Sequence, residues 1–108
     1  MLLYLHFSER ANRIDSELDL DINEINLLNM IAKAYTEKRV TFVGDLISSR
    51  QMASQATLHK ALKKLEAKNL IYGCTDTNDA RKRKIILTSQ AIQRYKKLEQ
   101  AIIRACAV

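Results

Sequence analysis

Proline is absent from this 108-residue sequence, and glycine occurs only at positions 44 and 73. An all-β domain needs turn-forming residues at every hairpin, so the shortage argues against that class of fold. Gly73 lies in an apolar run that ends in a polar cluster, where one hairpin fits. We expect a mainly α fold with a small β-hairpin. Residues 1–108 should form a single domain, because the chain is too short for two cores.

Cysteine is also scarce, since Cys74 and Cys106 lie far apart with no other cysteine near either. This spacing suits neither a disulfide framework nor a zinc site. We expect a reducing, cytoplasmic setting in which each thiol is buried or idle. A redox-sensing role for either thiol is the alternative.

Long apolar runs and catalytic signatures are missing as well. The apolar start, residues 1–7, is too short to span a membrane and lacks the features of a signal peptide. His6 and His59 have no metal-ligand spacing, and the sequence has neither a Ser/His/Asp arrangement nor a glycine-rich phosphate loop. We expect no enzyme activity, no metal, no cofactor and no membrane association.

Positive charge is concentrated in the second half of the chain. The net charge is +6: residues 1–49 hold 5 Lys/Arg and 8 Asp/Glu (−3), whereas residues 50–108 hold 13 and 4 (+9). A basic half of this size in a small domain is typical of a protein that binds a polyanion. Nucleic acid is favoured over an acidic membrane surface.

Apolar residues spaced by three or four positions predict a first helix over residues 1–18. Asp21 and Glu24 form a capping-box pattern at the start of a second helix, which should end near Lys38. The four tyrosines lie on apolar stripes and are expected in the core. They are Tyr4, Tyr35, Tyr72 and Tyr95.

The middle of the chain predicts two helices joined by a short turn. Thr41 is expected to cap a short third helix that runs to about Ser49, with a turn over residues 48–52. Ser54 should cap a fourth helix that ends near residue 68.

The last third of the chain predicts a hairpin and a final helix. The strands are expected over residues 70–74 and 82–87, with a polar turn between them. Thr88 should cap a last helix that runs almost to the C-terminus.

This order of elements is the layout of a winged helix-turn-helix, in which the second helix of the pair enters the major groove of DNA. The face of the fourth helix opposite its apolar side is basic, and small Ala56 near its start lets the backbone approach base edges. For the helix alone, a merely solvated lysine face is the alternative. The expected contacts with DNA are Ser54, Gln55, Ala56, Thr57, His59, Lys60, Lys63 and Lys64.

Four consecutive cations, residues 81–84, follow the polar turn of the hairpin. Like charges crowded on one strand repel each other, so this run favours a polyanionic partner. An arginine of such a wing can insert into the minor groove, and Asp79 can orient it by pairing with Arg81 or Arg83. The expected wing contacts are Asn78, Asp79, Arg81, Lys82, Arg83 and Lys84.

These residues resemble the MarR family of winged-helix transcriptional regulators. Residues 65–71 are similar to the family's Leu-Glu-x-x-Gly-Leu-Ile/Val pattern, and the wing carries a similar Asp-x-Arg at 79–81 and a closing Leu-Thr at 87–88. The resemblance covers roughly residues 20–98. It implies that Asp79 orients the wing, that Arg81 reaches the minor groove, and that residues from Ser54 to Lys64 contact the major groove.

The sequence departs from the family pattern in three ways. Asn69 stands where the family usually has glycine, a change that the left-handed conformation tolerates. Ala91 replaces another customary glycine. The terminal helices are short, as in the compact SarA-like regulators, which argues against a small-molecule effector site.

Both ends of the chain are apolar, and such surface is seldom left exposed on a monomer. We therefore expect a homodimer built from residues 1–18 and 88–108. The alternative is that these ends pack on the chain's own core. The expected dimer contacts are Leu3, Phe7, Leu98, Ile102 and Ile103.

The sequence thus predicts a homodimeric, sequence-specific regulator of transcription that binds double-stranded DNA. A replication or plasmid-partition protein with the same fold is one alternative. A winged-helix protein-interaction module is another.

Overall fold

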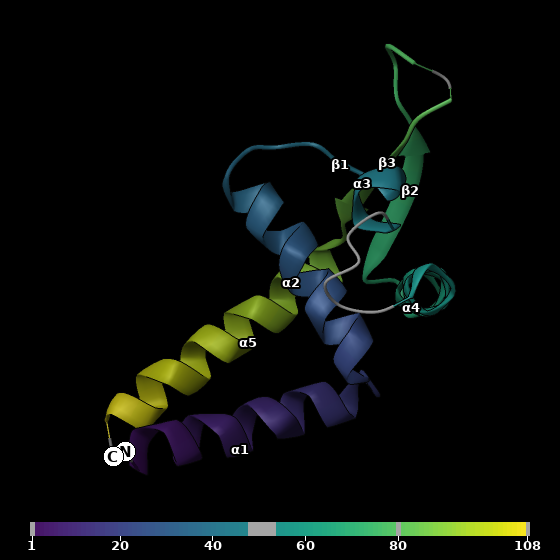
Figure 1. The fold of residues 1–108 in the computed structure, drawn as a ribbon. Helices are drawn as coiled ribbons and strands as arrows, with labels where there is room; N and C mark the ends of the chain where they lie inside the picture. Colours follow the sequence, from purple (N-terminus) through teal and green to yellow (C-terminus); the bar gives the residue numbers. More distant parts are fainter. Residues whose placement is uncertain (1, 48–53, 80, 108) are drawn as a thin grey trace.

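The computed structural model describes residues 2–47, 54–79 and 81–107. It is mostly helical with a small antiparallel sheet, which confirms the predicted fold class (Figure 1). The elements in chain order are α1 (Leu2–Glu17), α2 (Ile22–Thr36), β1 (Thr41–Phe42), α3 (Val43–Ile47), α4 (Gln55–Ala67), β2 (Ile71–Thr75), β3 (Arg83–Leu87) and α5 (Ser89–Cys106).

Three of the four predicted helix caps are present. The Asp21 carboxylate accepts a hydrogen bond from the backbone N–H of Glu24 at 2.9 Å, and the Glu24 carboxylate accepts one from the backbone N–H of Asp21 at 3.2 Å. Ser54 caps α4 and Thr88 caps α5 in the same manner. Each side-chain oxygen satisfies a backbone donor that has no partner inside its helix, so each cap fixes where the helix begins.

The sheet has the strand order β1-β3-β2, with every pairing antiparallel. The hairpin strands are β2 and β3, and their register places Gly73 opposite Ile85. The prediction for Thr41 was wrong: this residue does not cap a third helix but pairs with Ile85 in β1. Two residues show no periodicity, and their partners lie far along the chain, so local patterns did not reveal this strand. The turn predicted over residues 48–52 lies outside the described residues.

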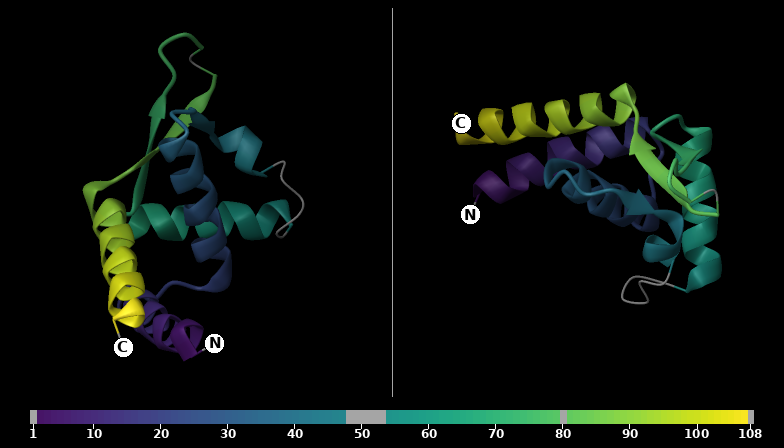
Figure 2. Two further views of the ribbon diagram at one scale, coloured as in Figure 1. Left: turned by 90° about the vertical axis from the view of Figure 1, so that its left-hand side faces the viewer. Right: turned by 90° about the horizontal axis from the view of Figure 1, so that it is seen from above.

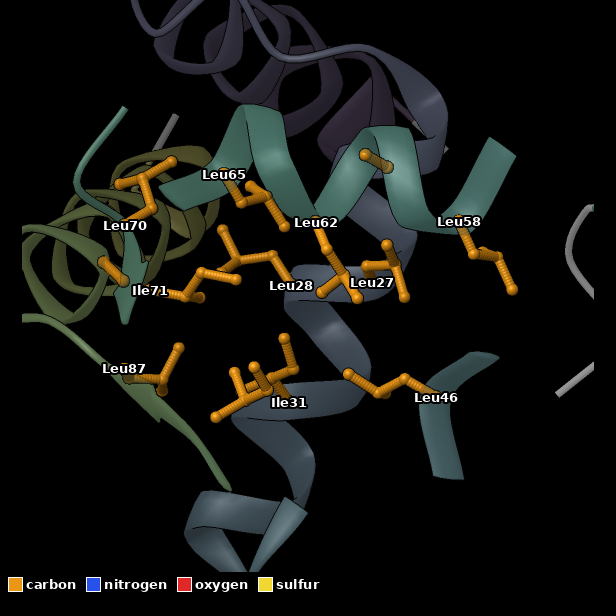
Figure 3. Packing of buried hydrophobic residues seen from close by; sticks show 13 residues of the cluster. Leu27, Leu28, Ile31, Leu46, Leu58, Leu62, Leu65, Leu70, Ile71 and Leu87 are labelled. Carbon is orange, nitrogen blue, oxygen red and sulfur yellow. The ribbon is translucent and has the colours of Figure 1, made fainter. Parts of the chain in front are cut away.

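The core is built where α4 crosses α2 and the base of the sheet closes one end (Figure 3). Apolar side chains of α2 face those of α4, as their helical spacing predicted. They are Leu27, Leu28 and Ile31 of α2 and Leu58, Ala61, Leu62 and Leu65 of α4, all fully or almost fully buried. Asn69 ends α4 in the left-handed conformation at φ 59°, so the chain turns directly into buried Leu70 and Ile71.

Helices α1 and α5 lie side by side and extend away from α4 and the hairpin (Figures 1 and 2). Nε of buried Arg94 on α5 donates to the Asp15 carboxylate of α1 at 2.7 Å. The Tyr95 hydroxyl donates to Oδ1 of Asn29 at 2.6 Å and so ties α5 to α2. Burial raises the pKa of Tyr95, so this hydroxyl stays protonated and able to donate at neutral pH.

Several apolar and aromatic side chains remain exposed. Leu3, Ile102 and Ile103 on the terminal helices are 47%, 49% and 67% exposed. The expectation that the tyrosines lie in the core was wrong for Tyr4, Tyr35 and Tyr72, each at least half exposed. The spacing of apolar residues identifies the apolar stripe of a helix, but tertiary packing decides whether another element covers that stripe. Among the described helices, none is long and apolar enough to cross a membrane.

Candidate nucleic-acid interface

Helix α4 separates a core face from a basic outer face. At about 100° per residue, the side opposite its buried leucines carries His59, Lys60 and Lys63, and all three are exposed. Gln55 and Ala56 are also exposed, in the first turn of the helix. The unpaired N–H groups and the dipole of this turn favour phosphate. The outer face of α4 therefore has small and polar side chains in the first turn and lysines in the turns that follow.

The two hydroxyls at the start of α4 already serve its cap. Oγ of Ser54 accepts a hydrogen bond from the Thr57 N–H at 3.3 Å, and the two hydroxyl oxygens lie 2.9 Å apart. Each hydroxyl keeps further hydrogen-bonding capacity for a phosphate or base. In the structure these hydroxyls hold the first turn of α4 in place. That turn contains the exposed side chains of Gln55 and Ala56.

Lys64 differs from the other predicted contacts, because it is engaged with α2. Its Nζ lies 3.2 Å from Oδ2 of Asp21, and its side chain is 44% exposed. The pKa of Asp21 is lowered, chiefly because the Glu24 N–H donates to the carboxylate, with a further contribution from Lys64. The carboxylate is therefore charged at neutral pH. Lys64 would have to leave this carboxylate in order to contact a phosphate group.

A second lysine at the end of α4, which no local sequence pattern indicates, anchors the helix. Nζ of Lys68 lies 2.7 Å from Oε2 of Glu24, whose side chain is 1% exposed, and also donates to the Asp19 carbonyl. A buried carboxylate is tolerated only when it is paired. Since more than forty residues separate the partners, only the capping-box pattern at Glu24 could have drawn attention to it.

The tip of the hairpin is ordered by Asp79. Its carboxylate accepts a hydrogen bond from the Arg81 backbone N–H at 3.0 Å and lies 3.4 Å from Nε of the same residue. The Arg81 side chain is 93% exposed, and Asn78 beside it is also exposed. The turn thus directs an arginine into solvent at the tip of a narrow two-stranded element.

The other three cations of the run are held closer to the sheet. Lys82 lies over the Phe42 ring of β1, 5.1 Å from its centroid. The Arg83 side chain passes over Gly73 of β2. Nζ of Lys84 lies 3.9 Å from Oδ1 of Asp76, and its side chain is only 26% exposed. The four consecutive charges therefore differ in their surroundings, and Arg81, with its 93% exposed side chain, lies at the tip of the hairpin.

The described residues contain no group of three or more His, Cys, Asp or Glu side chains placed to hold a metal ion. Cys74 is half-buried in β2, Cys106 is exposed at the end of α5, and both are free thiols. The predicted dimer residues gather on α1 and α5, with Phe7 and Leu98 half-buried and Leu3, Ile102 and Ile103 exposed.

No family model and no curated protein sequence matches the chain. Among solved structures, it is similar to Staphylococcus aureus MepR in a DNA complex, with TM-score 0.78 and 19% identity over 95% of this chain and 74% of MepR. It is similar to the transcriptional regulator Tm0710 of Thermotoga maritima, with TM-score 0.72 and 16% identity over 91% and 66% of the two chains. Bacillus subtilis YusO matches with TM-score 0.68 and 17% identity over 98% and 72%. All three are MarR-family winged-helix transcriptional regulators.

Proposed function

Because the chain has the winged-helix fold of MarR-family transcriptional regulators, we propose that it is a sequence-specific regulator that binds double-stranded DNA as a homodimer. Helix α4 lies in the major groove, and the β2–β3 hairpin reaches the adjacent minor groove. The structure of MepR with DNA supports this proposal at the level of the fold.

The observation that carries the proposal is the arrangement of exposed cations. The exposed face of α4 presents Lys60 and Lys63, and the hairpin tip presents Arg81. Lysines give phosphate contacts that set affinity and register, whereas contacts with base edges give sequence specificity. In α4 the base-reading positions are Gln55 and Ala56, which lie in the first turn and are exposed.

Two copies of α4 are needed to read two half-sites of an operator. The exposed apolar residues of α1 and α5 supply the surface for a second copy, because contiguous apolar patches seldom stay in water. Leu3, Ile102 and Ile103 form the centre of this proposed interface. With two recognition helices, the half-sites lie about 10 base pairs apart.

In this role the protein is not an enzyme. The protein acts in the cytoplasm, where Cys74 and Cys106 remain reduced thiols. A replication or partition protein would use the same DNA surface, and only the sequence of the bound DNA distinguishes such a protein from a transcriptional regulator. The first experiment is therefore to select bound duplexes from a random library.

Fluorescence anisotropy with a selected duplex then tests DNA binding. We expect tight binding at low salt that falls steeply as salt rises. K60Q/K63Q removes four lysines from the proposed dimer, so it should weaken binding and lower the salt slope by about 4. The control K33Q/K96Q removes the same charge from exposed lysines of α2 and α5 and should bind like the wild type. Absence of duplex binding at low salt, together with a stable protein partner in a pull-down, would assign the fold to protein interaction instead.

A further inference from the structure

The two-residue strand β1 connects helix α3 to the hairpin. Phe42 is the last residue of β1, pairs with Lys84 of β3 and directly precedes α3. Helix α3 in turn is fixed in the core by Leu46, which is 3% exposed. Lys82 lies two positions nearer the hairpin tip than Lys84, so it is the diagonal neighbour of Phe42 and within reach of its ring. The Lys82 Nζ lies over that ring, 5.1 Å from the centroid.

This contact ties the tip of the hairpin to another element. The Lys82 N–H donates to the Asp79 carbonyl, and the Lys82 carbonyl accepts from the Asp76 N–H, both at 3.0 Å. Among the hydrogen bonds, ion pairs and ring contacts of the described tip residues from Asp76 to Lys82, only the one with Phe42 leads outside the hairpin. Figure 1 shows the tip extending beyond α3 and the rest of the molecule.

An aromatic ring orders a cation without cancelling its charge. The face of the ring attracts an ammonium group through its quadrupole but carries no net charge. Lys64 and Lys84 differ in this respect, because each lies near an aspartate that offsets its charge. Within the described parts of the chain, no ion pair of 4.0 Å or less involves Lys82. The ammonium donors that point away from the ring are therefore free for a phosphate oxygen.

We propose that Phe42 is a positioning residue of the hairpin: its ring holds Lys82 in place for a phosphate contact and ties the hairpin tip to the start of α3. This inference rests on the proposed function, because the phosphate belongs to the duplex that α4 and Arg81 contact. A tip that is ordered before DNA binds loses less conformational entropy on binding. An exposed contact between a cation and a ring changes an equilibrium constant by about threefold.

Hydrogen exchange measured by NMR tests the positioning without DNA. F42L keeps an apolar side chain but removes the aromatic face, so we expect the Asp76 and Lys82 amides to exchange about threefold faster. The Thr88 amide, which donates to the Leu70 carbonyl at the other end of the hairpin, is the internal control and should not change. F42Y keeps a ring and should exchange like the wild type. K82Q removes the cation and should behave like F42L.

Anisotropy titrations with the selected duplex measure what the contact contributes to binding. A dimer loses the contact in both wings, so F42L should weaken binding about tenfold, and the salt slope should stay the same because no charge is removed. K82Q should lower the slope by about 2. Because Phe42 acts through Lys82, F42L should have no further effect in the K82Q background. F42Y should bind like the wild type, and so should the control V40A, which shortens the exposed residue before β1.

Two results would overturn the proposal. In the first, F42L and K82Q, both shown by circular dichroism to be folded, leave the exchange of the tip amides unchanged. In the second, F42L weakens duplex binding equally with and without Lys82, as a role in packing β1 alone would require. If F42L does not fold, K82Q decides the exchange test, because Lys82 is exposed. Absence of duplex binding by the wild type would refute the proposed function and the phosphate contact, whereas the exchange result would still decide whether Phe42 orders the tip.

Discussion

The guanidinium of Arg83 lies across Gly73 of the neighbouring strand, where a β-carbon at position 73 would come within 2.6 Å of its Nε. Arg83 pairs with Thr75 in the hairpin register, so Gly73 is its diagonal neighbour on the same face of the sheet. The glycine is thus the residue that lets this arginine lie flat on the hairpin. Without that space, the side chain has to move.

G73A should therefore act through Arg83. The clashing atoms are at the far end of a flexible side chain, so we expect the free energy of unfolding to change by less than about 1 kcal/mol. Duplex affinity should change by the same factor in G73A as in R83Q, and the double variant should be no weaker than either single one. Anisotropy titrations of the four proteins measure this cycle. Independent, additive losses would show that the two residues act separately.

R81Q should weaken duplex binding more than K84Q does. The Arg81 side chain is 93% exposed at the hairpin tip, whereas that of Lys84 is 26% exposed and lies near Asp76. Both substitutions remove one charge, so K84Q is a matched control for net charge. We expect R81Q, but not K84Q, to lower the salt slope by about 2, because the proposed dimer loses one such contact from each copy. Equal effects of the two variants on affinity and slope would contradict the assignment of Arg81 as the reaching residue.

K68M should destabilise the fold by roughly 2 kcal/mol, because it leaves the buried Glu24 carboxylate without its cation. E24Q/K68M removes both charges and should recover part of that loss. Urea unfolding followed by circular dichroism measures both values. K60M, an exposed lysine of the same helix, is the control and should change stability by less than about 0.5 kcal/mol. A loss in K68M no larger than that of K60M would show that the pair is unimportant.

D21A should cost about 1 kcal/mol at pH 7, because it removes the cap of α2 and the partner of Lys64. The pKa of Asp21 is lowered in the folded protein, mainly by the Glu24 N–H. The carboxylate therefore stabilises the fold above its unfolded value of about 4, and this contribution is lost as the pH falls through the lower folded value. Thermal unfolding between pH 3 and pH 7 should show the cost of D21A shrinking in acid. The uncharged cap removed in T88A should cost a similar amount at every pH, and parallel behaviour of the two variants would contradict the role of the charge.

I103D should convert the proposed dimer into a monomer. Ile103 is 67% exposed on α5, in the surface that we assign to the second copy, and a buried unpaired carboxylate is costly. I22D is the matched control, because Ile22 is 65% exposed at the start of α2, outside the terminal helices. Light scattering after gel filtration should find I22D dimeric and I103D monomeric. A monomeric wild-type protein would refute the proposed dimer itself.

Local sequence patterns identified most of the helices and the exposed face of α4. The caps at Asp21, Ser54 and Thr88 depend on hydrogen bonds that span three residues, and all three are present. The left-handed turn at Asn69 is equally local. Such features can be predicted from a single sequence, because both partners lie within one helical turn.

Longer-range features were not predicted. Strand β1 has two residues, too few for any period, and it exists because β3 offers a partner more than forty residues away. Lys64 and Lys60 look alike in sequence, and only the crossing of α4 over α2 gives Lys64 an ion-pair partner. Tyr4 and Tyr95 both lie on apolar stripes of their helices, but Tyr4 is exposed whereas Tyr95 is half-buried.

The sequence by itself determined where α2, α4 and α5 begin, which residues of each lie on an apolar stripe, and that the second half of the chain is basic. These properties follow from the spacing of residue types and from charge, which need no knowledge of the fold. The tertiary structure decided how the basic residues are used. It pairs Lys64 and Lys68 with α2, lays Arg83 over Gly73, leaves Arg81 exposed, and places Lys82 over the ring of Phe42. The reason is that an ion pair or a ring contact is formed by residues far apart in the chain, which only packing brings together.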